Sequence, residues 1–182
     1  MVISMFKHEK VLWITRTAVL IALIVALQFA TLQFPNQFIT GSIVNLMLII
    51  SVMTCGLSTG LTVSVFTPIL PTLLGFGPPP PLIPFIAAGN MALVTVWHFI
   101  GGREIISKYI SYIIATAAGA VVKFLILYFG IVKIAAPFIL GAPEASPIYI
   151  LFSYPQLITA SIGGICAVIL LPPLTKAIKA KK

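Results

Sequence analysis

The segment VLWITRTAVLIALIVALQFA, residues 11–30, is a long apolar stretch that contains one charged residue, Arg16. A helix rises about 1.5 Å per residue, so about 20 apolar residues cross the roughly 30 Å hydrocarbon core of a bilayer. Further apolar stretches follow at residues 42–57, 61–74, 82–100, 109–130 and 148–171. The sequence therefore predicts an all-α membrane protein with six transmembrane helices in a single domain, residues 1–182.

The composition excludes several other classes of protein. Of the 182 residues, 60% are hydrophobic and 8% are charged, whereas about a quarter of the residues of a soluble domain are charged. Because six helices use almost the whole chain, any ATPase would have to be a separate polypeptide. The net charge of +8 comes from cations near helix ends, which does not resemble a nucleic-acid-binding surface.

The distribution of cations predicts the orientation of the helices. In a six-helix chain, Lys133 lies on one side, Lys123 lies within a helix, and the other nine cations lie on the opposite side: Lys7, Lys10, Arg16, Arg103, Lys108, Lys176, Lys179, Lys181 and Lys182. Cytoplasmic segments carry an excess of Lys and Arg, so we expect both termini in the cytoplasm. Residues 31–41, 75–81 and 131–147 are then expected to form external loops.

Polar residues within the predicted helices lie at a common depth. Counted from the outer helix ends, Asn90, Lys123 and Gln156 are seven or eight residues deep, which is about 10 to 12 Å. Asn45 and Thr67 also lie in the outer halves of their helices. These five residues predict a substrate-binding pocket, although hydrogen bonds between helices would also explain the amides.

Lys123 is the strongest of these signals. An ammonium group that faces lipid costs at least about 2.5 kcal/mol, so such a residue usually faces a cavity or a partner. The three acidic residues, Glu9, Glu104 and Glu144, all fall outside the predicted helices. The predicted partner of Lys123 is therefore a carboxylate or phosphate of a ligand, and the alternative is that its long side chain reaches the outer interface.

The first predicted external loop is rich in amides. In TLQFPNQFITG, residues 31–41, Gln33, Asn36 and Gln37 alternate with aromatic residues. This mixture is suited to a lid over a polar organic ligand. An ordinary helix-capping loop has the same composition, so both interpretations remain open.

Helix 11–30 has a face of small residues, because Ala18, Ala22 and Ala26 recur every four residues. Such faces let another helix approach closely in a membrane. The approaching helix could belong to a partner protein or to this chain.

Neither a metal site nor a catalytic site is expected. Cys55 and Cys166 lie within apolar segments, and neither His8 nor His98 has a second metal ligand at helical spacing. No nucleophile has a histidine base at a matching depth. The sequence therefore predicts a protein that is not an enzyme.

The last predicted helix contains a proline. Pro155 predicts a kink in helix 148–171.

Taken together, these features resemble the substrate-binding subunit, or S-component, of energy-coupling factor (ECF) vitamin transporters. The resemblance covers the whole chain. It includes the basic N-terminal segment, the alanine face, and the segments TGSIVNLMLI (residues 40–49) and IPFIAAGNMALV (residues 83–94). The family implies a six-helix bundle in the plasma membrane of a prokaryotic-type cell.

The resemblance also implies a function and partners. It implies binding of a water-soluble vitamin at the outer side, followed by transport through toppling of the subunit in the membrane. Ala18, Ala22 and Ala26 would dock onto a transmembrane coupling subunit joined to two ATPases, so that ATP is used by the partners and this chain has no cofactor. Lys123 favours an anionic vitamin such as pantothenate. The alternative is a self-sufficient secondary transporter or small channel for a polar organic solute, but no carboxylate lies in a predicted helix to couple ions.

Overall fold

A computed structural model describes the backbone of residues 2–34 and 36–180 and the side chains of residues 9–34, 36–178 and 180. The predicted cytoplasmic cations Lys7, Lys179, Lys181 and Lys182 lie outside the described side chains, as does His8. Within the described ranges, every regular element is a helix.

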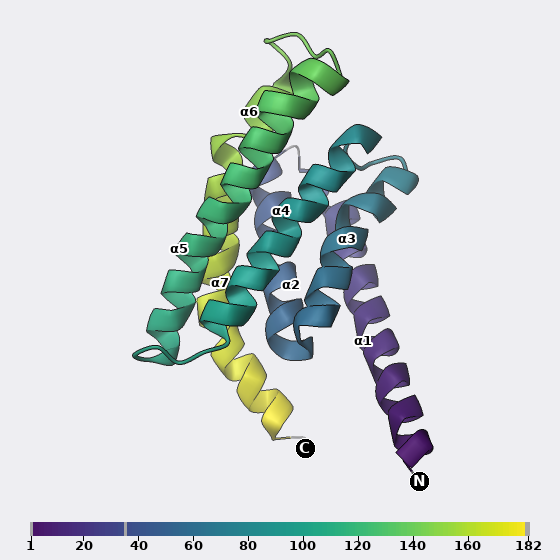
Figure 1. The fold of residues 1–182 in the computed structure, drawn as a ribbon, viewed down its shortest axis with the longest axis vertical. Helices are drawn as coiled ribbons and strands as arrows, with labels where there is room; N and C mark the ends of the chain where they lie inside the picture. The colour runs from purple at the N-terminus through teal and green to yellow at the C-terminus, as the bar shows by residue number, and fades with distance from the viewer. Residues whose placement is uncertain (1, 35, 181–182) are drawn as a thin grey trace.

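The helices follow one another with short connections. In chain order they are α1 (Val2–Thr31), α2 (Gln37–Cys55), α3 (Leu57–Leu73), the 3-10 turn η1 (Pro80–Leu82), α4 (Ile83–Val96), the π-helix η2 (Trp97–Gly101), α5 (Lys108–Leu127), the π-helix η3 (Tyr128–Ile139), α6 (Pro147–Leu151) and α7 (Tyr154–Lys179). The helices alternate in direction, and α1 begins at the same end of the bundle at which α7 finishes (Figure 1).

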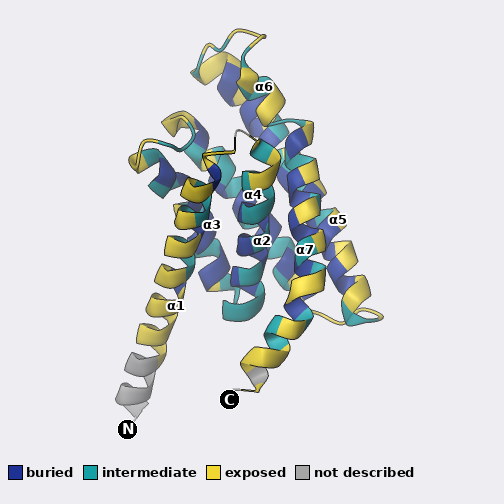
Figure 2. Cartoon of the chain, turned by 180° about the vertical axis from the view of Figure 1, so that it is seen from behind, coloured by how far each residue is buried: buried dark blue, intermediate teal, exposed yellow. Residues whose placement is uncertain are grey.

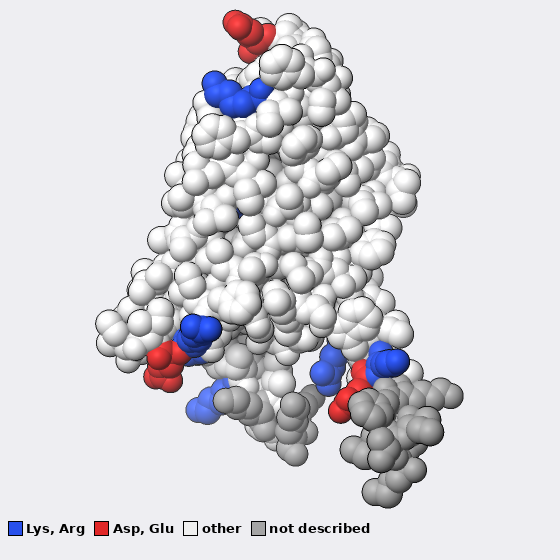
Figure 3. Space-filling view, in the orientation of Figure 1, with Lys and Arg blue, Asp and Glu red and all other residues white. Residues whose placement is uncertain are grey.

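Five helical segments are long and apolar enough to cross a membrane, and they are Glu9–Thr31, Gln37–Cys55, Pro80–Gly101, Lys108–Ile139 and Pro147–Ile178. Leu57–Leu73 is a shorter apolar helix. On the face seen in Figure 3, Lys, Arg, Asp and Glu gather at the two ends and leave an uncharged band between them. The chain therefore folds as an all-α bundle of a multi-pass membrane protein.

The helices are not equally enclosed. Helix α2 packs against α1, α3, α4 and α7, and its buried residues include Leu48 and Ile49, both 0% exposed. Helix α1 lies at the edge of the bundle and turns an exposed side outward (Figure 2). It contacts α2 and α3.

The apolar core has two parts. The larger cluster is built around Leu48, Val63, Leu93 and Trp97, and the smaller one consists of Leu82, Leu127, Ile131 and Ala135 with their half-buried neighbours. The smaller cluster explains why the predicted loop at 131–147 was wrong over most of its length. Residues 131–139 continue α5 as the π-helix η3, because Ile131 and Ala135 are fully buried there despite Pro137.

Two other boundaries differ from the sequence prediction. Residues 37–41 form the first turn of α2 rather than a loop, and Asn36 is the N-cap of that helix. The predicted helix 148–171 is broken between α6 and α7, and Pro155 lies in the first turn of α7. Proline is tolerated there because the first helical N–H groups have no partner within the helix. Pro155 therefore starts a helix instead of kinking one.

Glycine lets α2 and α7 approach closely. A Cβ atom on Gly163 of α7 would lie 2.7 Å from Asn45 Cβ and 2.9 Å from the backbone nitrogen of Leu46. Backbone atoms cannot rotate away, so a side chain at position 163 would push the two helices apart. Small residues at helix contacts are typical of membrane bundles.

We predict that Gly163→Ala destabilises the protein by about 1–3 kcal/mol, the usual cost of overpacking. The measurement is thermal unfolding of the purified protein in detergent. Ser161→Ala, two positions earlier on the same helix, is the control and should change the midpoint little. An unchanged midpoint for Gly163→Ala would mean that α2 and α7 are not in close contact.

Candidate binding site

Lys123 lies inside the bundle, and its side chain does not extend to the surface. Its side chain is 4% exposed. Its Nζ donates hydrogen bonds to Asn45 Oδ1 of α2 at 2.6 Å and to Asn90 Oδ1 of α4 at 2.7 Å. An ammonium group has three donors, and the described hydrogen bonds use two of them, both to neutral amides. A buried positive charge is therefore held by polar groups without a carboxylate.

Second hydrogen bonds orient the two asparagines. Asn45 Nδ2 donates to Thr159 Oγ1 of α7 at 3.3 Å, and Asn90 Nδ2 donates to the carbonyl oxygen of Ser64 of α3 at 3.5 Å. Because the NH₂ groups face these acceptors, the amide oxygens face the ammonium group. Five helices thus contribute to the polar cluster, namely α2, α3, α4, α5 and α7.

The packing of α4 makes room for the side chain of Lys123. A Cβ atom on Gly89 would lie 3.1 Å from Leu127 Cγ and 3.5 Å from Lys123 Cγ. Glycine at this position lets α4 lie against the aliphatic part of Lys123. Asn90, the next residue along α4, then reaches the ammonium group.

The polar cluster borders a cavity of about 190 Å³, which we call the Lys123 cavity. Its wall combines amides and hydroxyls with apolar residues of both core clusters: Gln28, Gln37, Thr40, Gly41, Val44, Asn45, Thr67, Pro68, Pro78, Ile86, Asn90, Lys123, Leu127, Phe152 and Gln156. Drug-sized ligands occupy pockets of about 300–1,000 Å³. The cavity therefore suits a smaller molecule.

The structure brings together most, but not all, of the predicted site residues. Six of them line the cavity, namely Lys123, Asn90, Gln156, Asn45, Thr67 and Gln37. The other two, Gln33 and Asn36, are not among the lining residues. Gln33 is exposed, and Asn36 Oδ1 accepts a hydrogen bond from the backbone N–H of Phe38 at 2.9 Å. Asn36 therefore acts as a helix cap.

Gln37 and Gln156 close one side of the cavity together. Their Nε2 atoms both donate to the carbonyl oxygen of Leu151, at 2.9 and 3.0 Å respectively. Leu151 ends α6, so the two glutamines tie the break between α6 and α7 to the start of α2. The break also supplies Phe152 to the cavity wall.

Gln28 is a lining residue that the sequence analysis missed. Its Oε1 atom is buried without a described hydrogen-bond partner, and the residue borders the cavity from α1. A buried unpaired acceptor costs free energy unless a ligand or water donates to it. Its position as an amide inside an apolar helix is the same kind of signal that identified Asn90, but Gln28 lies close to the end of α1 at Thr31, so the depth count did not group it with the other residues.

The alanine face of α1 points away from the bundle. Ala18, Ala22 and Ala26 are all exposed, whereas Thr17 and Ile24 on the same helix are buried. In the described structure, the close-packing surface expected from the sequence is therefore not used by another helix of this chain. It is available to lipid or to a partner protein.

Comparisons with known proteins give no family assignment. No family model, no curated protein and no solved structure matches the chain. The function is therefore inferred from the geometry of the cavity and from the sequence.

Proposed function

We propose that this chain is the substrate-binding S-component of an ECF-type importer, and that it captures a small anionic vitamin in the Lys123 cavity. The observation that carries this proposal is the buried ammonium group of Lys123, which bonds to two amide oxygens and borders an open volume. Removing a charge from water is costly, and neutral amides offset the cost only partly. An anionic ligand supplies the missing counter-charge.

The cavity wall narrows the class of ligand. A ligand carboxylate would accept a hydrogen bond from the remaining N–H of Lys123. A hydroxyl or amide N–H of the same ligand would donate a hydrogen bond to Gln28 Oε1. Apolar residues such as Val44, Ile86 and Leu127 would contact its hydrocarbon part. Pantothenate, which has one carboxylate, two hydroxyls and an amide, has this chemistry, and nicotinate is a smaller member of the same anionic class.

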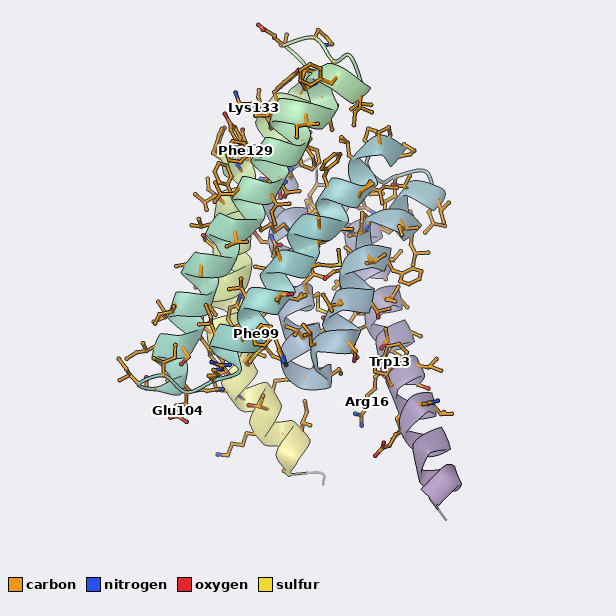
Figure 4. All side chains as sticks on the ribbon, viewed as in Figure 1. Trp13, Arg16, Phe99, Glu104, Phe129 and Lys133 are labelled. Carbon is orange, nitrogen blue, oxygen red and sulfur yellow. The ribbon has the colours of Figure 1, made fainter. Side chains whose placement is uncertain are left out.

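The proposal includes the membrane arrangement of the resembled family. The chain would cross the plasma membrane of a prokaryotic-type cell six times, with α3 as the shortest crossing and both termini in the cytoplasm. Arg16 and Glu104 lie toward the end of the bundle where α1 begins (Figure 4), and Lys and Arg side chains gather at that end (Figure 3). Arg103 directly precedes Glu104 in the chain. The positive-inside rule favours the cytoplasm for that end. The Lys123 cavity would then lie toward the outside, and toppling of the subunit would deliver the vitamin.

The exposed alanine face would be the contact with a transmembrane coupling subunit. Two ATPases joined to that subunit would supply the energy. A smooth face on an edge helix supports this role, because lipid tails fill such a surface less closely than a second helix does.

We predict that Lys123→Ala weakens binding of an anionic vitamin by about 10- to 100-fold, since a hydrogen bond to a charged group contributes about 1.5–3 kcal/mol. Binding is measured by calorimetry with pantothenate and nicotinate, and with their uncharged analogues pantothenol and nicotinamide. Lys133→Ala is the control, because Lys133 is exposed. Wild type and Lys133→Ala should bind the charged ligands more tightly than the uncharged ones, whereas Lys123→Ala should not.

Asn90→Asp separates the role of the charge from that of the fold. The new carboxylate would occupy the place of the Asn90 amide, 2.7 Å from Lys123 Nζ, and would neutralise the ammonium group without changing the side-chain size. The variant loses the hydrogen bond from Asn90 Nδ2 to the Ser64 carbonyl oxygen but gains an ion pair with Lys123. We expect it to fold and to lose the preference for charged ligands. If it keeps the preference, Lys123 is not the anion-binding group.

The docking surface has its own test. Ala22→Leu should reduce copurification with a coupling subunit and its ATPases at least about tenfold, because a larger side chain separates helices that pack through small residues. Binding of the vitamin should not change. Val19→Leu, at an exposed position next to the alanine face, is the control. Equal copurification of both variants would rule out the alanine face as the contact.

A further inference from the structure

A second and larger pocket lies where α4 turns into α5, and we call it the turn pocket. Its volume is about 890 Å³. Phe99 and Glu104, which both border it, lie toward the lower end of the bundle in Figure 4, whereas Lys133 lies at the upper end. Residues of α2 and α7 complete its wall. The proposed vitamin site uses none of its residues.

The charges of the turn pocket are mainly positive. Arg103 and Lys108 border it with one carboxylate, Glu104, and one imidazole, His98. Lys108 Nζ donates to the carbonyl oxygen of Gly102 at 3.1 Å and lies 5.4 Å from the centre of the Tyr112 ring. These contacts hold the cation at the pocket wall without pairing it with an acid. The N-terminus of α5, capped by Ser107, adds the positive end of a helix dipole.

Apolar side chains from two other helices also border the turn pocket. Val52 and Met53 of α2 and Pro172 of α7 border the same volume. Phe99 and Tyr109 are 50% and 57% exposed, as is common for aromatic residues at the level of lipid headgroups. The pocket therefore combines cations with apolar side chains, a lining that matches an anionic amphiphile.

The backbone shape around the pocket is unusual. Residues Trp97–Gly101 form a single π-helical turn, in which the N–H of Gly102 donates to the carbonyl oxygen of Trp97 at 3.0 Å. Such turns widen a helix and occur frequently at functional sites. Here the wide turn includes His98 and Phe99, which both contribute to the wall.

We propose that the turn pocket binds the phosphate group of an anionic phospholipid, with Arg103 and Lys108 as donors and the glycerol and upper acyl chain against Val52, Met53 and Pro172. Basic pockets between transmembrane helices are known to bind anionic headgroups. The bound lipid would join the α4–α5 turn to α2 and α7. This inference does not depend on the identity of the vitamin.

Native mass spectrometry of the full chain in detergent tests the proposal, with phosphatidylglycerol and phosphatidylcholine added at equal concentrations. We expect wild type to retain phosphatidylglycerol in preference to phosphatidylcholine. In Arg103→Gln/Lys108→Gln, the ratio of bound phosphatidylglycerol to bound phosphatidylcholine should fall at least about tenfold. The control, Lys10→Gln/Lys133→Gln, removes the same charge outside the pocket and should behave like wild type. An equal loss in the control would overturn the proposal, because it would mean that the net charge of the protein, and not the turn pocket, causes the preference for phosphatidylglycerol.

Two further measurements complete the test. An excess of inorganic phosphate should not displace the lipid; displacement would assign the pocket to free phosphate and contradict a lipid site. If the double variant does not fold, the single variant Arg103→Gln, at an exposed position, takes its place and should lose at least about threefold of the preference. An unchanged preference in a folded variant would also overturn the proposal.

Discussion

The structure is organised around one ammonium group, Lys123 Nζ, buried in a bundle whose lipid-facing band is uncharged. A charge in this environment needs polar contacts from several directions, and no single helix can supply them. Asn45 and Asn90 bring two oxygen atoms from α2 and α4 to the α5 lysine. Thr159 and Ser64 then fix the orientation of those amides from α7 and α3. Five helices therefore meet around one side chain.

Close packing makes these contacts possible. Gly163 brings α7 onto α2 at Asn45, and Gly89 brings α4 against the stem of Lys123. Val44 belongs to the larger apolar cluster and Leu127 to the smaller one, and both border the cavity. The cavity thus lies where the two parts of the core meet, which places apolar walls beside the charged site. Residues held by packing can position a site for one charge and shape of ligand.

The sequence predicted several of the polar residues that gather at the site, but neither their depth nor the directions of their side chains. Counting from the predicted helix ends grouped Asn90, Lys123 and Gln156, and all three line the cavity. Two of those ends differ in the structure, because η3 continues α5 to Ile139 and α7 begins at Tyr154. Rotation about each helix axis depends on packing between helices, so the bonds of Lys123 to Asn45 and Asn90 could not be predicted. For Asn36 the sequence left a lid residue and a helix cap as alternatives, and in the structure Asn36 caps α2. Residues 131–139 were expected to belong to an external loop, but burial of Ile131 and Ala135 extends the helix through them.

The most direct test of the central claim is the identity and position of the molecule that the protein binds. Protein purified in mild detergent from cells grown in rich medium would be denatured, and the released small molecules identified by mass spectrometry, for wild type and for Asn90→Asp in parallel. The account predicts a small organic anion that is released from wild type in about equimolar amount and is lost from Asn90→Asp. A neutral or cationic molecule, or an anion retained equally by both proteins, would contradict the role assigned to Lys123.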